Sequence, residues 1–553
     1  MRVVGIEGTA WCASAAVFDT ERDRVRIESD AYEPESGGIH PREAAEHMRE
    51  AIPSVIEATL ANADGPIDAV AFARGPGIGP CLRIVGSAAR ALAQGLDVPL
   101  VGVNHMVAHL EIGRHRSGFD SPVCLNASGA NAHVLGYHNG RYRVLGETMD
   151  TGVGNALDKF TRHVGWSHPG GPKVEEHAKR GEYVPLPYVV KGMDFSFSGI
   201  MSAAKDAYDD GTPVEDVCRG LEETVFGMLT EVAERALSLT GRDELVLGGG
   251  VGQNARLRGM LEAMCEQRGA EFYAPEGRFL RDNAGMVAVL GAKMYAAGDT
   301  LAVADSAVDP DYRPDEVPVT WRGDAEDVLL GGTGTDAGGD LRGAEAIVDV
   351  RGDEVSKTRR PKGYRHDALD ARLRRERTTS EARLLSEARR VGVPTPVLSD
   401  VDVPESTLTM ARVGDTDLRD ALSEERVAAV AEHLAAIHEA GFVHGDPTTR
   451  NARVAHDVAR DERAGADATR ASAYDSPGGE WGKRVHLIDF GLGYYTDDVE
   501  DYAMDLRVFE GSIRGTADDP DPLVAAAEAA YREAGDSDVV ARLREVEERG
   551  RYR

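Results

Sequence analysis

The sequence of 553 residues is short of lysine, and its acidic residues far outnumber its basic ones. Nine of the 63 basic residues are lysine, which leaves 63 − 9 = 54 arginines against 94 acidic residues and a net charge of −31. An acidic, lysine-poor surface is typical of proteins that stay soluble in concentrated salt, so we expect a halophilic source. The alternative is an ordinary acidic cytoplasmic protein. Self-repulsion at this charge should weaken the fold at low salt.

Cysteine pairs and long apolar runs are also lacking. The five cysteines all lie in the first half, and none forms a Cys-x-x-Cys pair, which predicts reduced, buried thiols in a cytoplasmic protein. No run of 18 apolar residues exists, so we expect no membrane span. The first residues, 1–5, lead straight into an expected strand, which argues against a signal peptide. The length predicts two to four domains.

Two histidines four residues apart, His105 and His109, are the first candidates for chemistry. They follow a buried strand expected at 98–103 and a good N-cap, Asn104, so both should lie on one face of a helix. Zinc peptidases carry glutamate directly after the first histidine, whereas this chain has Met106. A His-x-x-x-His pair alone is more often a pair of core or surface histidines than a metal site.

A third ligand must therefore come from elsewhere in the chain. Asp282 opens a helix expected to end near residue 297, where it could be a helix cap or a carboxylate ligand. Two histidines and one carboxylate with open positions suit Fe(II) or Zn(II).

Glycine-rich turns punctuate the alternating strands and helices of the first half. The turns at 5–10 and 127–131 look like one device used twice, each between a strand and a returning strand. This duplication predicts two related α/β lobes with a cleft between them. The loop 75–80 could equally bind a phosphate or be a plain tight turn.

Several motifs of the first 320 residues occur in one order and together resemble a known family. They are Gly5-Ile6-Glu7-Gly8-Thr9-Ala10, His105 with His109, Ser128-Gly129, Gly170-Gly171-Pro172, Phe195-Ser196-Phe197-Ser198-Gly199, the loop 248–254, and Asp282-Asn283-Ala284. The family is that of tRNA threonylcarbamoyladenosine synthases, in the archaeal and eukaryotic KEOPS form. The resemblance implies the two-lobed actin/Hsp70-like (ASKHA) α/β fold. It also implies transfer of the threonylcarbamoyl group from threonylcarbamoyl-AMP to the N6 amine of adenosine 37 in tRNAs that read ANN codons.

The resemblance also assigns roles. It makes His105, His109 and Asp282 ligands of one Fe(II), with Zn as the alternative. It places Asp158, Gly171, Glu175 and Asn254 on the adenylate, together with a substrate loop that consists of Asn126, Ala127, Ser128, Gly129 and Ala130. Asn126 replaces the usual tyrosine of that loop, which puts a further metal contact in doubt, and Ala130 replaces a usual glycine. No residue stands out as the general base.

The second half carries the parts of a protein kinase in their usual order. After an expected flexible linker at 323–339 come Lys357, a helical glutamate, Asp446 with Asn451 five residues on, and Asp489 before Phe490-Gly491. With Gly343-Ala344-Glu345-Ala346 and Lys362-Gly363-Tyr364-Arg365, these parts resemble the small atypical serine/threonine kinase/ATPase of KEOPS. The domains implied are therefore an ASKHA domain at 1–322 and a minimal kinase-like α+β domain at 340–553.

By this resemblance the second domain binds ATP and Mg²⁺. Asp446 is the catalytic aspartate, Asn451 and Asp489 hold Mg²⁺, and Glu381 is the partner of Lys357, with Glu376 as the alternative. Gly343, Ala344, Glu345 and Ala346 belong to the ATP-binding set. Only 553 − 489 = 64 residues follow Asp489, without an Ala-Pro-Glu segment, which favours ATP hydrolysis or autophosphorylation. Residues 455–482 are polar and should form a surface insertion.

Two basic stretches are candidate tRNA contacts. Residues 357–377 hold nine basic and three acidic residues, a local charge of +6, and residues 549–553 are basic too; each could equally be a solvated face. The other implied partners are threonylcarbamoyl-AMP and the small dimerising and bridging subunits of KEOPS, with no membrane. The rival interpretations are an ATP-binding scaffold without turnover, and a metallopeptidase with a regulatory kinase.

Overall fold

The computed structural model describes residues 1–32, 39–138, 140–323, 340–342, 345–455, 485–517 and 519–551. The chain divides into two compact units: unit 1 comprises Met1–Gly332 and Lys362–Leu369, and unit 2 comprises Thr333–Pro361 and Asp370–Tyr552. Apart from Gly323 and Ala455, the expected linker and insertion lie outside the described residues. Among the helices that are described, none has the length and apolar character to cross a membrane.

Two five-stranded sheets of the same topology form unit 1. The first has the order β3(Arg24–Ala31), β2(Cys12–Asp19), β1(Arg2–Glu7), β4(Ala69–Gly75), β5(Leu100–Asn104), and the second β8(Arg141–Glu147), β7(Ala132–His138), β6(Val123–Ala127), β11(Glu244–Gly248), β12(Glu271–Tyr273). In each, the central strand pairs antiparallel with the next strand in sequence and parallel with a later one. The predicted duplication is therefore confirmed.

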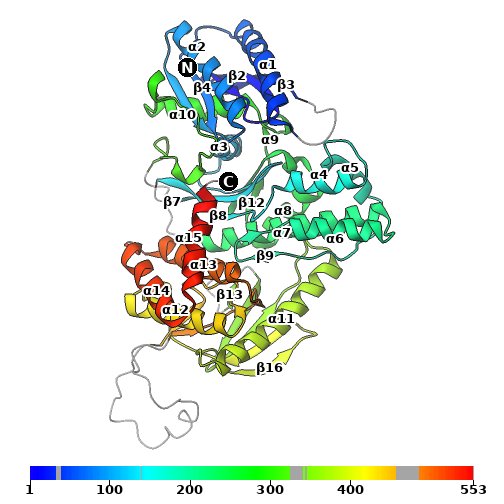
Figure 1. The fold of residues 1–553 in the computed structure, drawn as a ribbon, viewed down its shortest axis with the longest axis vertical. Coiled ribbons are helices and arrows are strands. Elements are labelled where there is room, and N and C mark those ends of the chain that lie inside the picture. Colours follow the sequence, from blue (N-terminus) through cyan, green and yellow to red (C-terminus); the bar gives the residue numbers. More distant parts are fainter. Residues whose placement is uncertain are drawn as a thin grey trace, which may run out of the picture. The chain divides into compact units, whose positions relative to one another are not determined.

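Helix α3(His105–Ser117) lies between these two sheets (Figure 1). It contacts β5 and α10(Ala284–Ala296) of the first lobe and β11 of the second. The contacts are close: a Cβ on Gly113 would lie 2.2 Å from Val246 Cγ1, and a Cβ on Gly5 would lie 2.4 Å from the carbonyl oxygen of Ala284. Glycine at both positions lets α3 and α10 approach the sheets closely, which fixes the start of each helix at the junction of the lobes.

The remaining helices of unit 1 divide between the two lobes. In the first lobe these are α1(Pro41–Ala61) and α2(Gly79–Leu96). In the second lobe they are α4(Val153–His163), α5(Gly171–Ala178), α6(Ser198–Asp209), α7(Val214–Thr240), α8(Ala255–Arg268) and the short α9(Gly277–Leu280).

Unit 2 combines an antiparallel sheet with a helical part. The sheet has the order β13(Asp340–Arg342), β14(Ala346–Arg351), β15(Glu354–Arg359), β17(Thr407–Ala411), β16(Leu398–Asp402), and α11(Asp367–Arg390) follows β15 in the chain. The helical part contains α12(Glu424–Glu439), α13(Val499–Thr516), α14(Pro520–Ala534) and α15(Ser537–Arg551). Short strands lie before and after the predicted residues Asp446, Asn451 and Asp489. These strands are β19(Phe442–Val443), β20(Ala452–Val454), β21(Val485–Leu487) and β22(Tyr494–Tyr495).

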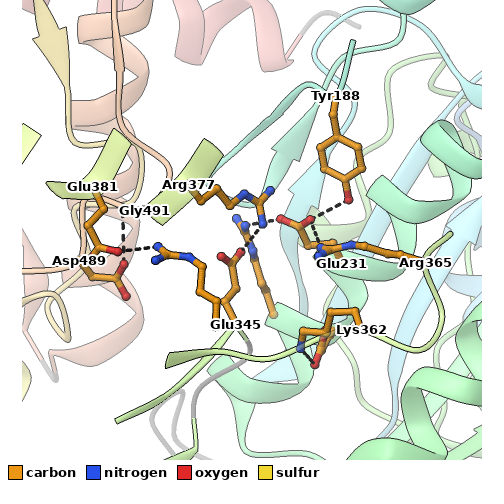
Figure 2. A network of polar contacts seen from close by, with 12 residues as sticks. Tyr188, Glu231, Glu345, Lys362, Arg365, Arg377, Glu381, Asp489 and Gly491 are labelled. Carbon is orange, nitrogen blue, oxygen red and sulfur yellow. Dashed lines mark hydrogen bonds and ion pairs between the residues drawn. The ribbon is translucent and has the colours of Figure 1, made fainter. Parts of the chain in front are cut away.

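The segment 362–369 lies between β15 and α11 in sequence but belongs to unit 1. Tyr364 is buried in the hydrophobic core of the second lobe, and Lys362 Nζ donates to Glu234 Oε1 at 2.6 Å. Arg365 forms an ion pair with Glu231, whose Oε2 also accepts from the hydroxyl of Tyr188 at 2.7 Å (Figure 2). Two basic residues of the predicted 357–377 patch are thus bound to carboxylates of α7.

All five cysteines are free and buried, as the sequence predicts. Burial raises the pKa of Cys81 to about 11 and that of Cys12, Cys124, Cys218 and Cys265 to about 12.

Because the thiolate is the reactive form, a thiol reagent at pH 8 should label none of the five cysteines in molar KCl. As KCl is lowered and acidic self-repulsion unfolds the chain, labelling should rise to five. Mass spectrometry alongside circular dichroism measures this, and rapid labelling in high salt would contradict the buried arrangement.

Candidate metal and nucleotide sites

The two predicted histidines lie on the first turns of α3, where β5 ends. The side chain of Asn104 accepts hydrogen bonds from the backbone N–H groups of Met106 and Val107 at 3.0 and 3.1 Å, which confirms it as the N-cap. Asp282 just precedes α10, whose cap is instead Asn283, since its side chain accepts from the N–H of Met286. The interpretation of Asp282 as a helix cap is therefore wrong, and its carboxylate is available for other contacts.

His105, His109 and Asp282 converge on one point. The Nε2 atoms of His105 and His109 lie 3.3 and 3.2 Å from Asp282 Oδ1, and one ligand atom from each residue lies within 4.8 Å of the others. Both histidines are buried, and His109 Nδ1 has no hydrogen-bond partner within the described chain. Two imidazole nitrogens and one carboxylate oxygen directed at a shared point form a donor set that fits a divalent cation.

Glu7 and Trp11 hold this donor set in place. Glu7 is fully buried, and its Oε2 lies 3.1 Å from His105 Nδ1 while its Oε1 accepts from the N–H of Thr9 at 2.7 Å. In this contact the Nδ1–H group of His105 donates to the carboxylate of Glu7, and Nε2 is directed at Asp282. Trp11 Nε1 donates to Asp282 Oδ2 at 3.0 Å, so Oδ1 alone faces the histidines.

The carboxylates make the point of convergence electronegative. Although burial lowers the pKa of His105, Glu7 and Asp282 raise it to about 10. Burial, together with the neighbouring His105, lowers the pKa of His109. The carboxylates therefore favour a positive charge on His105, whereas His109 is favoured in its neutral form. A bound cation would supply the positive charge in place of the His105 proton.

The substrate loop predicted at Asn126–Ala130 continues from the end of β6, on the second lobe. Asn126 is buried; its amide nitrogen faces the sulfur of Met106 at 3.6 Å, while its Oδ1 has no hydrogen-bond partner among the described residues. Ala127 is buried, whereas Gly129 and Ala130 are exposed. The N–H of Gly154, at the start of α4, bonds to the carbonyl of Ser128, so the loop is fixed at its base and open at its tip.

The four predicted adenylate residues lie in the second lobe, around α4, α5 and α8. Asp158 Oδ1 accepts from the N–H of Gly170 at 2.7 Å, directly before Gly171 opens α5. Glu175 Oε1 accepts from the N–H of Ala255 at 3.1 Å. These bonds tie the start of α5 to a side chain of α4, and the start of α8 to a side chain of α5.

Asn254, the fourth, is occupied by intramolecular bonds. Its Oδ1 caps α8 by accepting from the N–H groups of Arg256 and Leu257, and its Nδ2 donates to Glu222 Oε1 at 2.7 Å. The side chain therefore positions the start of α8, and Glu222 beneath it is a residue that the sequence does not single out.

Glu222 should make stability depend on pH. Burial raises its pKa to about 7, although the hydrogen bond from Asn254 lowers it; the ordinary value is 4.5. Between these values the folded protein keeps a proton that the unfolded chain loses, so stability falls as pH rises from about 4.5 to 7. Glu222→Gln should remove this loss, worth up to about 3 kcal/mol at pH 8. Denaturant unfolding at pH 5 and 8 in high salt measures it, with the exposed Glu262→Gln on α8 as control. An unchanged pH dependence in Glu222→Gln would contradict the assignment.

The loop at 75–80 uses two of its backbone N–H groups in bonds within unit 1. The N–H of Gly77 donates to the carbonyl of Pro310 and that of Ile78 to the carbonyl of Thr9, at 3.1 and 2.7 Å. These two N–H groups are therefore engaged by the backbone, which favours the plain turn of the two alternatives.

In unit 2 the predicted lysine, glutamate and aspartate meet. Lys357 on β15 is buried, and its Nζ lies 2.8 Å from Glu381 Oε1 on α11 and 2.5 Å from Asp489 Oδ1. Glu381 also pairs with Arg359. Although burial raises the pKa of Asp489, Lys357 and Arg359 lower it, so the carboxylate is ionised. Glu376, the alternative partner, is exposed.

Asp446 and Asn451 lie in one loop that follows β19. Asn451 Nδ2 donates to Asp446 Oδ2 at 3.0 Å and to its carbonyl oxygen at 2.8 Å. Asp505 on α13 holds the start of the loop, since its carboxylate accepts from the N–H groups of His444 and Gly445, both at 2.8 Å. Asp446, Asn451 and Asp489 together offer two carboxylates and one amide. This set is suited to a hydrated Mg²⁺ and phosphates.

The predicted Gly-Ala-Glu-Ala stretch is only partly described. Gly343 and Ala344 lie outside the described residues, whereas Ala346 is buried at the start of β14. Glu345 Oε1 accepts from Arg377 Nη1 at 3.0 Å (Figure 2). This contact is within unit 2.

Most of the predicted basic patch at 357–377 is neutralised. Six of its nine basic residues form ion pairs with carboxylates: Lys357, Arg359, Lys362, Arg365, Arg374 and Arg377. Arg360 and Arg375 are exposed. The side chains of 549–553 lie outside the described part.

Sequence reasoning missed Glu7, Trp11, Asp150 and Asp505 as supporting residues. Asp150 binds the Phe195–Gly199 motif by accepting from Ser196 Oγ and from the N–H groups of Phe197 and Ser198. A usable signal exists only for Glu7, which lies inside one of the motifs named above; the others act across long sequence separations.

Comparison with known proteins shows to which family the chain is similar. The sequence profile of tRNA N6-adenosine threonylcarbamoyltransferases matches residues 22–289. Proteins of Halobacterium salinarum and Haloarcula marismortui are 71% and 67% identical over 557 and 571 residues, covering 100% of this chain and 99% and 100% of theirs. A protein of Methanospirillum hungatei is 49% identical over 555 residues, covering 100% of this chain and 99% of its own. Each is named a probable bifunctional tRNA threonylcarbamoyladenosine biosynthesis protein.

Proposed function

Because the chain belongs to the family of bifunctional tRNA threonylcarbamoyladenosine biosynthesis proteins, we propose that unit 1 transfers threonylcarbamoyl to tRNA and unit 2 is a kinase-like ATPase that supports it. The donor is threonylcarbamoyl-AMP and the acceptor is the N6 amine of adenosine 37 in tRNAs that read ANN codons. The domains proposed are the ASKHA domain at 1–322 and the kinase-like domain at 340–553.

The observation that carries the proposal is the convergence of His105, His109 and Asp282 at the junction of the two lobes. A bound Fe(II), or alternatively Zn(II), would polarise the carbamoyl carbonyl and orient the threonyl end. Glu7 and Trp11 fix the donor atoms, so little reorganisation is needed when the cation binds.

The chain's own residues have separate tasks in the transfer. Asp158, Gly171, Glu175 and Asn254 hold the adenylate. The loop Asn126–Ala130 lies open at its tip for the acyl phosphate. The adenine N6 forms a bond to the carbamoyl carbon while the bond from that carbon to the phosphate oxygen breaks, and AMP leaves. One proton of the amine departs to a base that we do not assign to any residue.

In unit 2, Lys357 and Glu381 would position ATP phosphates, Asn451 and Asp489 would hold Mg²⁺, and Asp446 would act as the catalytic aspartate. We propose a cytoplasmic protein that works with the small dimerising and bridging subunits of KEOPS. The metallopeptidase alternative is disfavoured, because the position of the peptidase glutamate is held by Met106, which is buried against Asn126.

Nucleoside analysis by mass spectrometry tests the transfer. The protein in molar KCl receives unmodified tRNA and threonylcarbamoyl-AMP, with partner subunits added. Threonylcarbamoyladenosine should form in proportion to AMP released. A folded, metal-loaded protein that forms none in the presence of partners would refute the transferase.

A further inference from the structure

A groove beside Asp282 is lined by arginines that the transfer site described above does not use. It has a volume of about 1030 Å³, and all its lining residues belong to unit 1. Its walls come from the start of β2, the edge strand β3, the end of α3, and the segment that leads from α9 to Asp282. Five lining residues are arginines, Arg24, Arg26, Arg116, Arg278 and Arg281, and three are carboxylates, Asp23, Glu28 and Asp282.

Ion pairing divides these arginines into two groups. Arg26 pairs with Asp64 at 2.9 Å and Arg116 with Glu276 at 2.8 Å. The other three, Arg24, Arg278 and Arg281, are exposed and form an ion pair with no carboxylate in the described part of the chain. In a protein of net charge −31, three such guanidinium groups on one groove indicate an anionic ligand.

Trp11 gives the same groove an aromatic surface at its inner end. Its indole N–H is held by Asp282 Oδ2 at 3.0 Å, and the guanidinium carbon of Arg281 lies 6.0 Å from the centre of its ring. The ring is therefore fixed, half-buried and adjacent to a proposed metal ligand. Cationic groups along a groove combined with an aromatic ring are what single-stranded nucleic acid requires, since phosphates bind the former and bases stack on the latter.

We propose that this groove holds the single-stranded RNA next to the adenosine that is modified, with Arg24, Arg278 and Arg281 on phosphates and a base stacked on Trp11. The inference rests on the proposed transfer reaction and adds the path by which its RNA substrate reaches Asp282. RNA is favoured over an acidic protein because the aromatic surface directly adjoins the reaction centre. The neutralisation of 357–377 also removes most of the charge from the rival patch.

The test compares two triple variants of equal charge change. The groove variant is Arg24→Glu, Arg278→Glu, Arg281→Glu, and the control is Arg83→Glu, Arg383→Glu, Arg412→Glu, three exposed arginines outside both the groove and the stretch 357–377. Fluorescence anisotropy with labelled tRNA, at several KCl concentrations that keep the fold, gives Kd and its salt dependence. The groove variant should raise Kd at least about ten-fold and flatten the salt dependence, and the control should change it less than about two-fold.

A second measurement isolates the aromatic contact. The chain has four tryptophans, so a variant that keeps Trp11 carries phenylalanine at Trp166, Trp321 and Trp481. In this variant tRNA should quench the fluorescence, and threonylcarbamoyl-AMP alone should not. In transfer assays the groove variant should raise KM for tRNA while keeping its metal content and its KM for threonylcarbamoyl-AMP.

These readouts separate failure of the inference from failure of the proposed function. Unchanged tRNA affinity in the groove variant, or equal losses in both triple variants, would overturn the groove even if wild type makes product. Loss of a partner subunit from the groove variant with tRNA affinity intact would overturn it in favour of a protein interface. Absence of product from wild type would refute the transferase, whereas tRNA binding would still report on the groove.

Discussion

Asp282→Ala should abolish both metal binding and threonylcarbamoyl transfer in unit 1. Asp282 Oδ1 is the atom that both histidine Nε2 nitrogens face, at 3.3 and 3.2 Å, and it is the negative ligand of the set. Its removal leaves two imidazoles one helical turn apart, which hold a divalent cation weakly. We expect metal affinity to fall by more than about a hundred-fold, beyond the usual loss for an outer-shell partner. Calorimetry with Fe(II) under nitrogen, or with Zn(II), measures the affinity, and nucleoside analysis measures the transfer.

Graded variants make this prediction specific. Glu7→Gln keeps the ligands but weakens the hold on the Nδ1 proton of His105, so metal affinity should fall by about ten- to a hundred-fold. His163→Ala, at a half-exposed histidine on α4 that pairs with Asp209, is the matched control and should bind metal as wild type does. Full transfer activity in a metal-free Asp282→Ala protein would remove the metal from the mechanism. Equal losses in His163→Ala would indicate a general defect of the fold.

Features carried by local sequence can be predicted. The placement of the two histidines on one helix face follows from one helix and its cap, and the two lobes each contain the same strand–turn–strand motif. Both features can therefore be predicted from short stretches of sequence. The choice between a cap and a ligand at Asp282 cannot be made from spacing. The choice is decided by the next residue, Asn283, whose side chain accepts the hydrogen bond from the N–H of Met286 and so caps the helix.

Contacts that join distant segments are beyond the sequence. Glu7 meets His105 across 98 positions and Trp11 meets Asp282 across 271, and nothing in the local pattern marks either pair. The charge of 357–377 misleads for the same reason. A run of basic residues does not reveal that carboxylates such as Glu231 and Glu234 come from a helix more than a hundred residues away.

Asp489→Asn should reduce ATP hydrolysis by unit 2 at least about a hundred-fold while leaving the fold intact. Asp489 has a φ of 64°, in the left-handed region that asparagine tolerates well, so the substitution does not strain the backbone. The amide oxygen can still accept from Lys357 Nζ, but it no longer supplies the negative charge that Mg²⁺ requires. Phosphate release and thermal unfolding, both in high salt, measure the two effects. Asp353→Asn, in the exposed turn between β14 and β15, is the control.

The same experiment separates an ATPase from a scaffold that only binds ATP. Asp446→Asn keeps an oxygen for the hydrogen bond from Asn451, so ATP should still bind, whereas kcat should fall as sharply as in Asp489→Asn. A scaffold predicts instead that wild type and both variants hydrolyse ATP equally slowly, with only Asp489→Asn weakening binding. Lys357 is unsuitable for this purpose, because its removal takes the shared cation from Asp489 and from the buried carboxylate of Glu381. That loss would destabilise unit 2 and confuse loss of chemistry with loss of structure.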